Sequence, residues 1–200
     1  MADDRLARAL AAIDAANADD PVRITVRGEE RPKEVAHSEL VGEWVQRLTE
    51  APSDELLLAA RAHHLRRWAI PRGSYPMGRS GYLRWRKAQH EQHATDVARI
   101  LDDAGYDAAT ISRVQDLVRK RGLGRDADTR EPEVQVLEDA LCLVFLETQL
   151  AELASRFDDD KVIDILQKTA KKMSDQGLAC ARDVELDADS RALLDRALAG

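Results

Sequence analysis

Residues 133–157, EVQVLEDALCLVFLETQLAELASRF, form the stretch that most clearly decides the fold of this chain. They follow Pro132, and every residue from 140 to 146 is apolar. Proline fits the first turn of a helix, and a helix that is apolar all round has to be covered by protein on every side. The stretch therefore predicts a central helix that other helices surround.

Patterns typical of helices also fill most of the remaining sequence. Alanine, leucine and charged residues dominate long stretches, and the glycines and prolines fall between these stretches. Residues 22–26 alternate like a short strand, but no pairing partner is evident. The sequence predicts an all-α protein, a single compact helical domain over residues 1–200 with about seven to nine helices. The further helices are expected near residues 4–16, 33–48, 54–68, 82–104, 108–123, 161–177 and 188–199.

Capping residues mark several of these boundaries. Ser53, Asp107 and Asp187 stand directly before three of the expected helices. Their side-chain oxygens are suited to accept hydrogen bonds from the free N–H groups of a first helical turn. A charged loop, GRDADTRE at residues 124–131, is expected before the central helix.

The composition limits the class of protein. The chain has 200 residues, of which 44% are hydrophobic and 34% charged, and this suits a soluble protein of one or two domains. No apolar run approaches the roughly 20 residues that span a bilayer, and the start, MADDRLARAL, is too acidic for a signal peptide. We therefore expect a cytoplasmic protein that does not contact a membrane. Cys142 and Cys180 lack the spacing of a metal or redox motif and are expected to be reduced packing residues.

A basic window stands out in this chain, whose net charge is -7. Residues 56–90 hold eight Lys or Arg and three His without an Asp or Glu, together with two of the three Trp and two of the three Tyr. The rest of the chain then carries about -15, so an anion would meet a basic surface on an acidic body. We favour an anion site over a solvated basic face. Because the whole chain is acidic, binding of RNA or another nucleic acid is the weaker alternative.

All five histidines lie between residues 37 and 93, and each is expected on the inward side of its helix. A lone inward histidine is more often a core residue than a ligand, but convergence from three helices favours a shared site. Glu138 and Asp139 open the apolar run, where a carboxylate needs a cation, a metal or a donor group. Imidazoles with a carboxylate suit Zn, Fe or Mn better than Mg or Ca. An arginine such as Arg61 or Arg67 is the alternative partner for Asp139.

Four segments resemble, in this order, a family of unknown function of the DUF4202 type. This resemblance covers most of the chain and is specific, but it implies no activity. The segments are ARAHHLRRWAIPR at 60–72, YPMGRSGYLRWR at 75–86, LEDALCLVFLE at 137–147 and ILQKTAKKMS at 165–174.

A more distant resemblance is to the HD-domain metal-dependent phosphohydrolases, which are all-helical. Their pattern is a His, then a His-Asp pair, in some members two further His, and a final Asp. His37 resembles the first ligand, AARAHHL the helix with the His-Asp pair, His93 the third-helix His, and LEDALCL the segment with the closing Asp, Asp139. The resemblance implies an HD-like core at about residues 33–157, with C-terminal helices at 159–198 packed on it.

The chain departs from that pattern at two places. It has His63-His64 instead of a His-Asp pair, which removes the carboxylate that bridges two metals. The pattern leaves open which of these two histidines is equivalent to the leading His of the pair. It has Lys120-Arg121 where a fourth His would follow, and a cation there repels a metal unless it takes over phosphate binding. The resemblance then implies one transition-metal ion. The candidate ligands are His37, His63, His64, His93 and Asp139.

The basic window and the apolar run supply the remaining candidates. Arginine binds phosphate oxygens through bidentate forks and lysine as a point charge, while aromatic rings either stack on a base or sugar or pack the loop. Glu138 is expected to act as general base or to orient a ligand histidine, and Lys120 to act on phosphate in the catalytic site. The candidate substrate-binding residues are Arg66, Arg67, Arg72, Arg79, Arg84, Arg86, Lys87, Trp68, Tyr75, Tyr82 and Trp85.

Two functions follow from these observations. One is an HD-like metal-dependent phosphohydrolase or phosphodiesterase that acts on a nucleotide or another phosphorylated small molecule. The alternative is a degenerate, non-catalytic HD-like module that holds a phosphorylated ligand or a protein partner through its basic pocket. The convergence of histidines favours the first function, and the His63-His64 pair with Lys120 favours the second.

Overall fold

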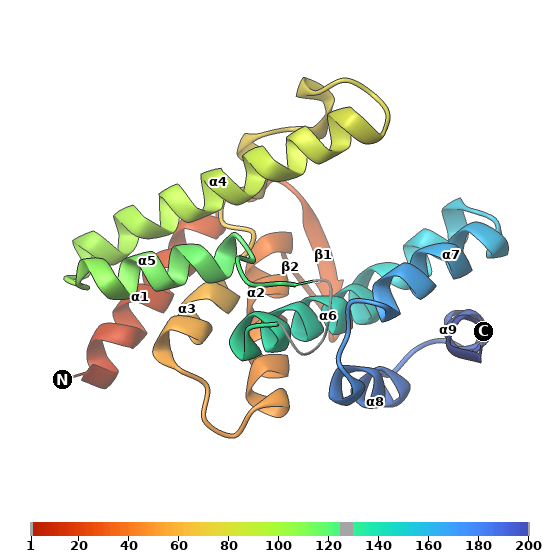
Figure 1. Cartoon of the computed structure of the whole chain (residues 1–200). Helices are drawn as coiled ribbons and strands as arrows, with labels where there is room; N and C mark the ends of the chain where they lie inside the picture. The colour runs from red at the N-terminus through yellow and green to blue at the C-terminus, as the bar shows by residue number, and fades with distance from the viewer. Residues whose placement is uncertain (1, 125–129, 200) are drawn as a thin grey trace.

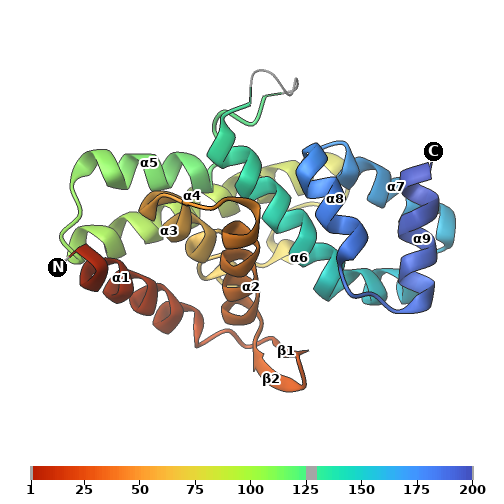
Figure 2. The same ribbon diagram turned by 90° about the horizontal axis from the view of Figure 1, so that it is seen from below.

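Helix α6 (Pro132–Arg156) runs through the middle of the molecule and is the central helix that the apolar run predicts (Figures 1 and 2). The side chain of Glu131 caps it by accepting a hydrogen bond from Val134 N at 2.9 Å. Helices from both halves of the chain contact α6, so the hydrophobic core is built around it.

The structure is a computed structural model that describes residues 2–124 and 130–199. Within these residues it has nine α-helices, two short 3-10 helices and one two-stranded sheet, so the predicted all-α class is confirmed. None of the helices in these ranges is long and apolar enough to cross a membrane. The other elements are α1 (Ala2–Asn17), β1 (Arg23–Val26), β2 (Glu29–Pro32), α2 (Lys33–Leu48), α3 (Asp54–Ala62), η1 (Arg67–Ala69), η2 (Arg72–Ser74), α4 (Arg79–Asp103), α5 (Ala108–Val118), α7 (Asp159–Ala170), α8 (Asp175–Asp183) and α9 (Ala188–Ala199).

One hydrophobic core joins all of these α-helices. Helix α1 packs on α3 and α4, so the core extends to residues before 33, where an HD-like core was expected to begin. The C-terminal helices α7, α8 and α9 each contact α6. The largest fully buried aliphatic side chains are Ile13, Leu56, Leu58, Leu65, Leu101, Leu117, Leu137, Leu143, Leu146, Leu150 and Leu166.

The short strand predicted at residues 22–26 has a partner that the sequence pattern did not show. Strands β1 and β2 pair antiparallel, with Val26 opposite Glu29. The two residues between them, Arg27 and Gly28, have φ values of 52° and 83°, as a tight hairpin turn requires. The second strand is EERP, and this polar sequence lacks the alternation that marks a strand.

Capping residues are where the sequence placed them. Ser53, Asp107 and Asp187 each accept a hydrogen bond from a first-turn backbone N–H, at 3.0, 2.8 and 2.9 Å. The starts of α3, α5 and α9 are therefore confirmed. Of the predicted charged loop, residues 125–129 lie outside the described part of the chain.

The end of α3 is the largest departure from the expected helices. The helix ends at Ala62, not near Trp68, and Pro71 therefore does not close it. His63 and His64 lie in the turn that follows rather than on a helix. The predicted stripe that joined His64 to Trp68 on one helical face is wrong.

Side chains of α4 explain why the chain turns there. Gln89 donates hydrogen bonds to Arg67 O at 2.8 Å and to Ile70 O at 3.1 Å, and His93 donates to Leu65 O at 2.7 Å. In a continuous helix Leu65 O would accept a hydrogen bond from Ala69 N–H, whereas Arg67 O would have no donor, because Pro71 has no N–H. The side chains of α4 supply donors to these carbonyls and hold the turn.

The predicted helix at 161–177 is in fact two helices, α7 and α8. Ser174 begins the second one, because its hydroxyl accepts a hydrogen bond from Gly177 N at 3.0 Å. Asp139 of α6 in turn binds Ser174 N at 2.9 Å and the Ser174 hydroxyl at 2.5 Å. A carboxylate 35 residues earlier in the sequence therefore fixes this break.

Candidate metal centre and anion cavity

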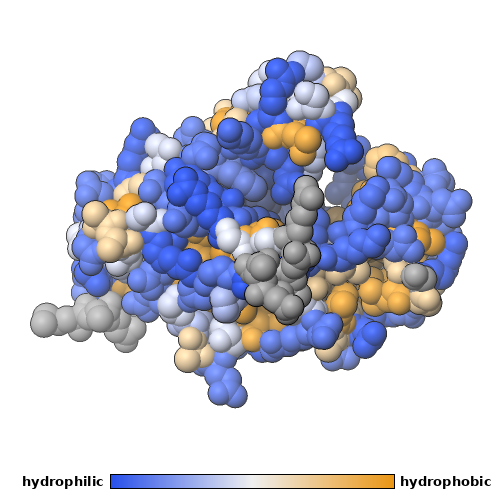
Figure 3. Space-filling view, viewed as in Figure 1, coloured by the Kyte–Doolittle hydropathy of each residue, from blue (hydrophilic) through white to orange (hydrophobic). Residues whose placement is uncertain are grey.

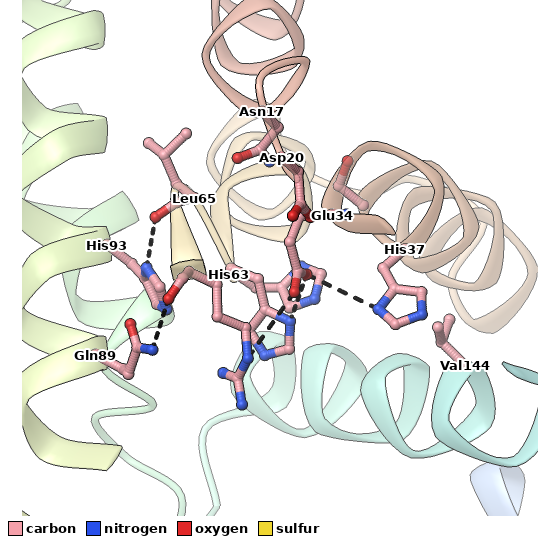
Figure 4. A network of polar contacts seen from close by, with 12 residues as sticks. Asn17, Asp20, Glu34, His37, His63, Leu65, Gln89, His93 and Val144 are labelled. Carbon is pink, nitrogen blue, oxygen red and sulfur yellow. Dashed lines mark hydrogen bonds and ion pairs between the residues drawn. The ribbon is translucent and has the colours of Figure 1, made fainter. Parts of the chain in front are cut away.

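Three side chains with metal-ligating atoms meet between α2 and the turn after α3. They are Glu34, His37 and His64, and the three ligand atoms all lie within 4.8 Å of one another. Glu34 Oε2 is 3.0 Å from His64 Nδ1 and 3.8 Å from His37 Nδ1 (Figure 4). Glu34 and His37 are only 4% and 2% exposed. This cluster could hold a metal ion, and it contains two of the ligands expected from the sequence.

The first turn of α2 places two of these side chains. Glu34 and His37 are three residues apart and therefore lie on the same face of the helix. Asp20 fixes the turn, because its Oδ2 accepts a hydrogen bond from Glu34 N at 3.0 Å. The start of a helix leaves such N–H groups without an intrahelical partner.

Thr148 of α6 determines which nitrogen of His37 carries the proton. The Thr148 hydroxyl donates to Val144 O at 2.7 Å, which uses its only proton. In the 3.2 Å contact between Thr148 Oγ1 and His37 Nε2, the ring N–H must therefore be the donor. The neutral ring then has its lone pair on Nδ1, which faces Glu34 Oε2. A lone pair opposite a carboxylate oxygen is a place that suits a cation.

Burial keeps the two imidazoles of the cluster neutral. It lowers the pKa of His37 to about 4, although the Glu34 carboxylate opposes the shift. Burial, followed by the positive charge of Arg67, holds the pKa of His64 well below its ordinary value. Neutral imidazole is the form that binds a metal ion.

His63 and His93 stand beside this cluster but are not part of it. Their ring centroids lie 4.2 Å and 5.9 Å from that of His64. Nδ1–H of His63 donates to Ala60 O at 2.8 Å. Nδ1–H of His93 donates to Leu65 O at 2.7 Å (Figure 4). Each ring therefore has a lone pair on Nε2, and His93 Nε2 is buried without a hydrogen-bond partner in the described part of the chain. Both rings have a tautomer that suits a ligand, but they lie outside the three-residue cluster.

Asp139 does not close the ligand set, which corrects the prediction. Besides Ser174 N and Oγ, its carboxylate accepts a hydrogen bond from Gln135 Nε2 at 2.9 Å. Burial raises the pKa of Asp139, and the hydrogen bonds from Ser174 and Gln135 oppose this shift. Glu34 is the carboxylate that lies beside the imidazoles, at the place where the sequence put Asp139.

A cavity of about 300 Å³ opens beside the cluster. His64 and Arg67 connect the two, because both line the cavity and lie 3.0 Å and 3.9 Å from Glu34 oxygens. The wall of the cavity comes from the turn after α3, from α4, from the end of α5, from α6 and from α7 with the residues after it. Figure 3 shows the surface hollowed between the projecting start of α4 and α7.

The cavity wall is rich in positive charge. Among the described residues it includes Arg67, Arg86, Lys120 and Lys172, against the single acid Glu138. Lys120 forms an ion pair with Glu138, and Lys172 Nζ lies 4.0 Å from the other Glu138 oxygen. Burial by itself would raise the pKa of Glu138, but Lys120 and then Lys172 outweigh burial and hold it below the usual range. The excess of cations makes the cavity suited to an anion.

Part of the predicted substrate-binding set lines this cavity. Arg67, Tyr82 and Arg86 do so, and the last two share one face of α4. Trp85 is buried behind them, with its Nε1–H donating to Ile70 O at 2.9 Å. The Arg67 guanidinium lies over the Trp85 ring at 4.9 Å. Trp85 therefore supports Arg67 instead of offering a stacking face.

The other predicted binding residues do not line the cavity, which corrects the expectation for the basic window. Arg84 and Lys87 are exposed on another face of α4, because a helix divides neighbouring side chains among its faces. Arg72 donates to the carbonyls of Tyr75 and Pro76 and so folds the loop before α4. Besides Trp85, the residues of the predicted set outside the cavity wall are Arg66, Trp68, Arg72, Tyr75, Arg79, Arg84 and Lys87.

The sequence reasoning missed Glu34 and Lys172. A sequence pattern could have identified Glu34, because this residue precedes His37 by three positions at the start of an expected helix. No sequence pattern pointed to Lys172, because it was expected inside a continuous helix. Cys142 also lines the cavity, but burial raises the pKa of its thiol to about 12, which agrees with a packing role.

Comparison with known proteins identifies a family but no activity. Neither a curated protein nor a solved structure gives a significant match to this chain. A match to a described family extends over residues 7–194. The chain therefore belongs to the family described as Domain of unknown function (DUF4202).

Proposed function

We propose that this protein is an HD-like metal-dependent phosphohydrolase or phosphodiesterase that acts on a nucleotide or another phosphorylated small molecule. The observation that carries the proposal is the position of His64, which belongs both to the Glu34–His37–His64 cluster and to the wall of the cation-lined cavity. A reaction of this class needs a metal site within reach of a phosphate site. The acidic chain as a whole makes nucleic acid a less suitable partner than a small molecule.

Zn, Fe or Mn would fit the cluster best. Two imidazoles and one carboxylate are typical ligands of these ions, whereas Mg and Ca prefer oxygen ligands alone. The lone pair that Thr148 leaves on His37 Nδ1 is directed at Glu34, as expected for a ligand histidine. When bound, a divalent ion of this kind lowers the pKa of water and supplies a nucleophile near neutral pH.

The cavity residues have separate roles in this proposal. Arg67 and Arg86 bind phosphate oxygens through their planar forks, and Lys172 adds a point charge. Glu138 is the acid of the cavity, so it is the group that accepts a proton from water. Lys120 holds that carboxylate in its ionised form and binds phosphate when the substrate enters.

Binding without turnover is the second candidate. The direct ion pair between Lys120 and Glu138 favours it, because a carboxylate already paired with a cation is a weaker base. In this alternative the cavity holds a phosphorylated ligand or a protein partner, and His37 and His64 contribute only to the fold.

The test begins with metal analysis of protein purified without chelator. We expect about one equivalent of Zn, Fe or Mn, a lower melting temperature after chelation, and hydrolysis of a generic phosphomonoester or phosphodiester that depends on the added metal. The site variant is Glu34→Gln, which should lose metal and activity. The matched control is Glu43→Gln on the same helix, where the carboxylate is exposed and paired with Arg27.

The outcomes separate the two candidates. Absence of stoichiometric metal, together with a melting temperature that no metal changes, would contradict the enzyme. Stabilisation by inorganic phosphate without any turnover in the presence of metal would favour the binding module. Loss of activity in both Glu34→Gln and Glu43→Gln would mean that the activity does not depend on this cluster.

A further inference from the structure

Helices α6 and α7 supply an apolar patch to the cavity wall, beside the polar side chains of Glu138, Gln149 and Thr169. Leu141 and Phe145 lie one turn apart on α6, and Ile165 lies on α7. All three side chains are half-buried, so each leaves apolar surface open to this cavity. Apolar surface that the fold leaves open next to a few polar groups is typical of a small-molecule site.

Positive charge lies in the same cavity and is only partly neutralised. Arg86 has no ion-pair partner within the described residues, and Lys172 lies 4.0 Å from Glu138, at the limit of an ion pair. Inorganic phosphate would neutralise these cations but would leave the apolar wall facing water. A ligand with an apolar group attached to its phosphate covers both kinds of surface.

The size of the cavity matches a compact apolar group. Its volume of about 300 Å³ is at the lower end of the range for small-molecule pockets, which is roughly 300 to 1,000 Å³. One phosphate and one ring-sized group fill this space, whereas most of a long acyl chain or a dinucleotide would lie outside it.

We propose that the cavity binds a phosphate monoester whose organic part is one compact apolar group, such as an aromatic ring. Phosphate esters of polar alcohols and inorganic phosphate bind less tightly. The inference rests on the anion site of the proposed function and specifies the class of ligand for that site. The apolar wall, and not the number of phosphate contacts, sets the preference.

Three phosphonates test this on the full-length chain by isothermal titration calorimetry, since their carbon–phosphorus bond resists hydrolysis. They are phenylphosphonate, methylphosphonate and 2-hydroxyethylphosphonate. We expect phenylphosphonate to bind about tenfold more tightly than methylphosphonate, because it buries the apolar wall. The hydroxyethyl compound should bind no more tightly than the methyl compound.

Variants of the wall assign the preference to this cavity. Phe145→Ala should remove most of the advantage of the phenyl compound and leave the affinity for methylphosphonate unchanged. Ile165→Thr keeps the branched shape of the side chain and should remove part of the advantage of the phenyl compound. This second variant keeps the test valid if Phe145→Ala does not fold. Phe157→Ala is the matched control, because Phe157 is 46% exposed and does not line the cavity. Arg86→Gln should weaken binding of all three compounds by the same factor.

The outcomes separate the class of ligand from the anion site. Equal affinities for the phenyl and methyl compounds would overturn the proposed class of ligand but would not contradict the anion site. An advantage of the phenyl compound that survives both Phe145→Ala and Ile165→Thr would also overturn it. If neither inorganic phosphate nor any phosphonate binds, the anion site of the proposed function fails as well.

Discussion

Two buried carboxylates, Glu34 and Asp139, have opposite surroundings. Asp139 is 2% exposed, and its oxygens accept hydrogen bonds from Ser174 N, Ser174 Oγ and Gln135 Nε2. Glu34 is 4% exposed, and its Oε2 faces Nδ1 of two neutral imidazoles. All three neighbours of Asp139 donate to it, whereas the two imidazoles beside Glu34 differ. His64 donates its Nδ1–H to Glu34 Oε2 at 3.0 Å, and His37 directs a lone pair towards the same oxygen.

The contrast distinguishes a carboxylate that is satisfied inside the fold from one that could bind a metal ion. Uncharged donors that surround a buried carboxylate satisfy it and fasten two segments together. Imidazole nitrogens held in one tautomer by a second hydrogen bond are typical of metal ligands. Burial of an acid does not distinguish the two cases, but the protons on its neighbours do.

The largest expected effect is on metal affinity in Glu34→Gln. The amide lacks the charge of the carboxylate, and we expect the affinity to fall by about 100-fold or more, beyond the usual effect of losing a supporting partner. Competition with a chromogenic chelator measures it. Unchanged affinity, with Glu43→Gln as reference, would show that Glu34 is no more a ligand than Asp139.

A smaller effect on metal affinity is expected from Thr148→Val. This change removes the acceptor that holds the proton on His37 Nε2, and we expect an affinity loss of roughly 10- to 100-fold. Thr148→Ser restores the hydroxyl and should bind metal nearly as well as the wild type. If the Ser and Val variants are equally weak, packing of the Thr148 methyl group matters and the tautomer does not.

Asp139→Asn should affect stability and leave metal binding unchanged. The amide cannot accept as many hydrogen bonds from Ser174 and Gln135, and we expect the free energy of unfolding to fall by about 1 to 3 kcal/mol. Urea denaturation measures this loss. If the folded variant loses its metal, Asp139 is a metal ligand after all, and its role does not differ from that proposed for Glu34.

The smallest expected effect is the coupling between the two sites. Glu34 and Asp139 have no hydrogen-bond partner in common among the described contacts. In metal-free protein, the stability changes of Glu34→Gln and Asp139→Asn should therefore add to within about 0.5 kcal/mol in the double variant. A coupling above about 1 kcal/mol would mean that the two carboxylates belong to one network.

Local sequence predicted most of the helices and part of the site. The sequence predicted the apolar run of α6 and the caps Ser53, Asp107 and Asp187, because each of these features depends on residues within one or two helical turns. His37 was assigned to the site because its inward position follows from the helical period. His64 was also assigned to the site, but it was expected on a helix and lies in the turn after α3. No residue near it in the sequence marks the end of α3.

The remaining predictions depended on contacts between distant segments. The ends of α3 and α7 are set from α4 and α6, by Gln89, His93 and Asp139. Because Asp139 is used in this way, it is not available to the histidines. The basic window likewise divides into residues that line the cavity, such as Arg86, and exposed ones, such as Arg84, according to the face of α4 on which each lies.

The helical class, the central helix, the histidines gathered at residues 37–93 and the acid-free basic window at residues 56–90 all follow from the sequence alone, since periodicity, caps and charge are properties of neighbouring residues. The packing of distant segments sets which carboxylate lies beside the imidazoles, which nitrogen of His37 keeps its proton, and which cations line the cavity. These features depend on hydrogen bonds between residues as far apart as His37 and Thr148. Such a bond forms only when the packed core brings the two segments together.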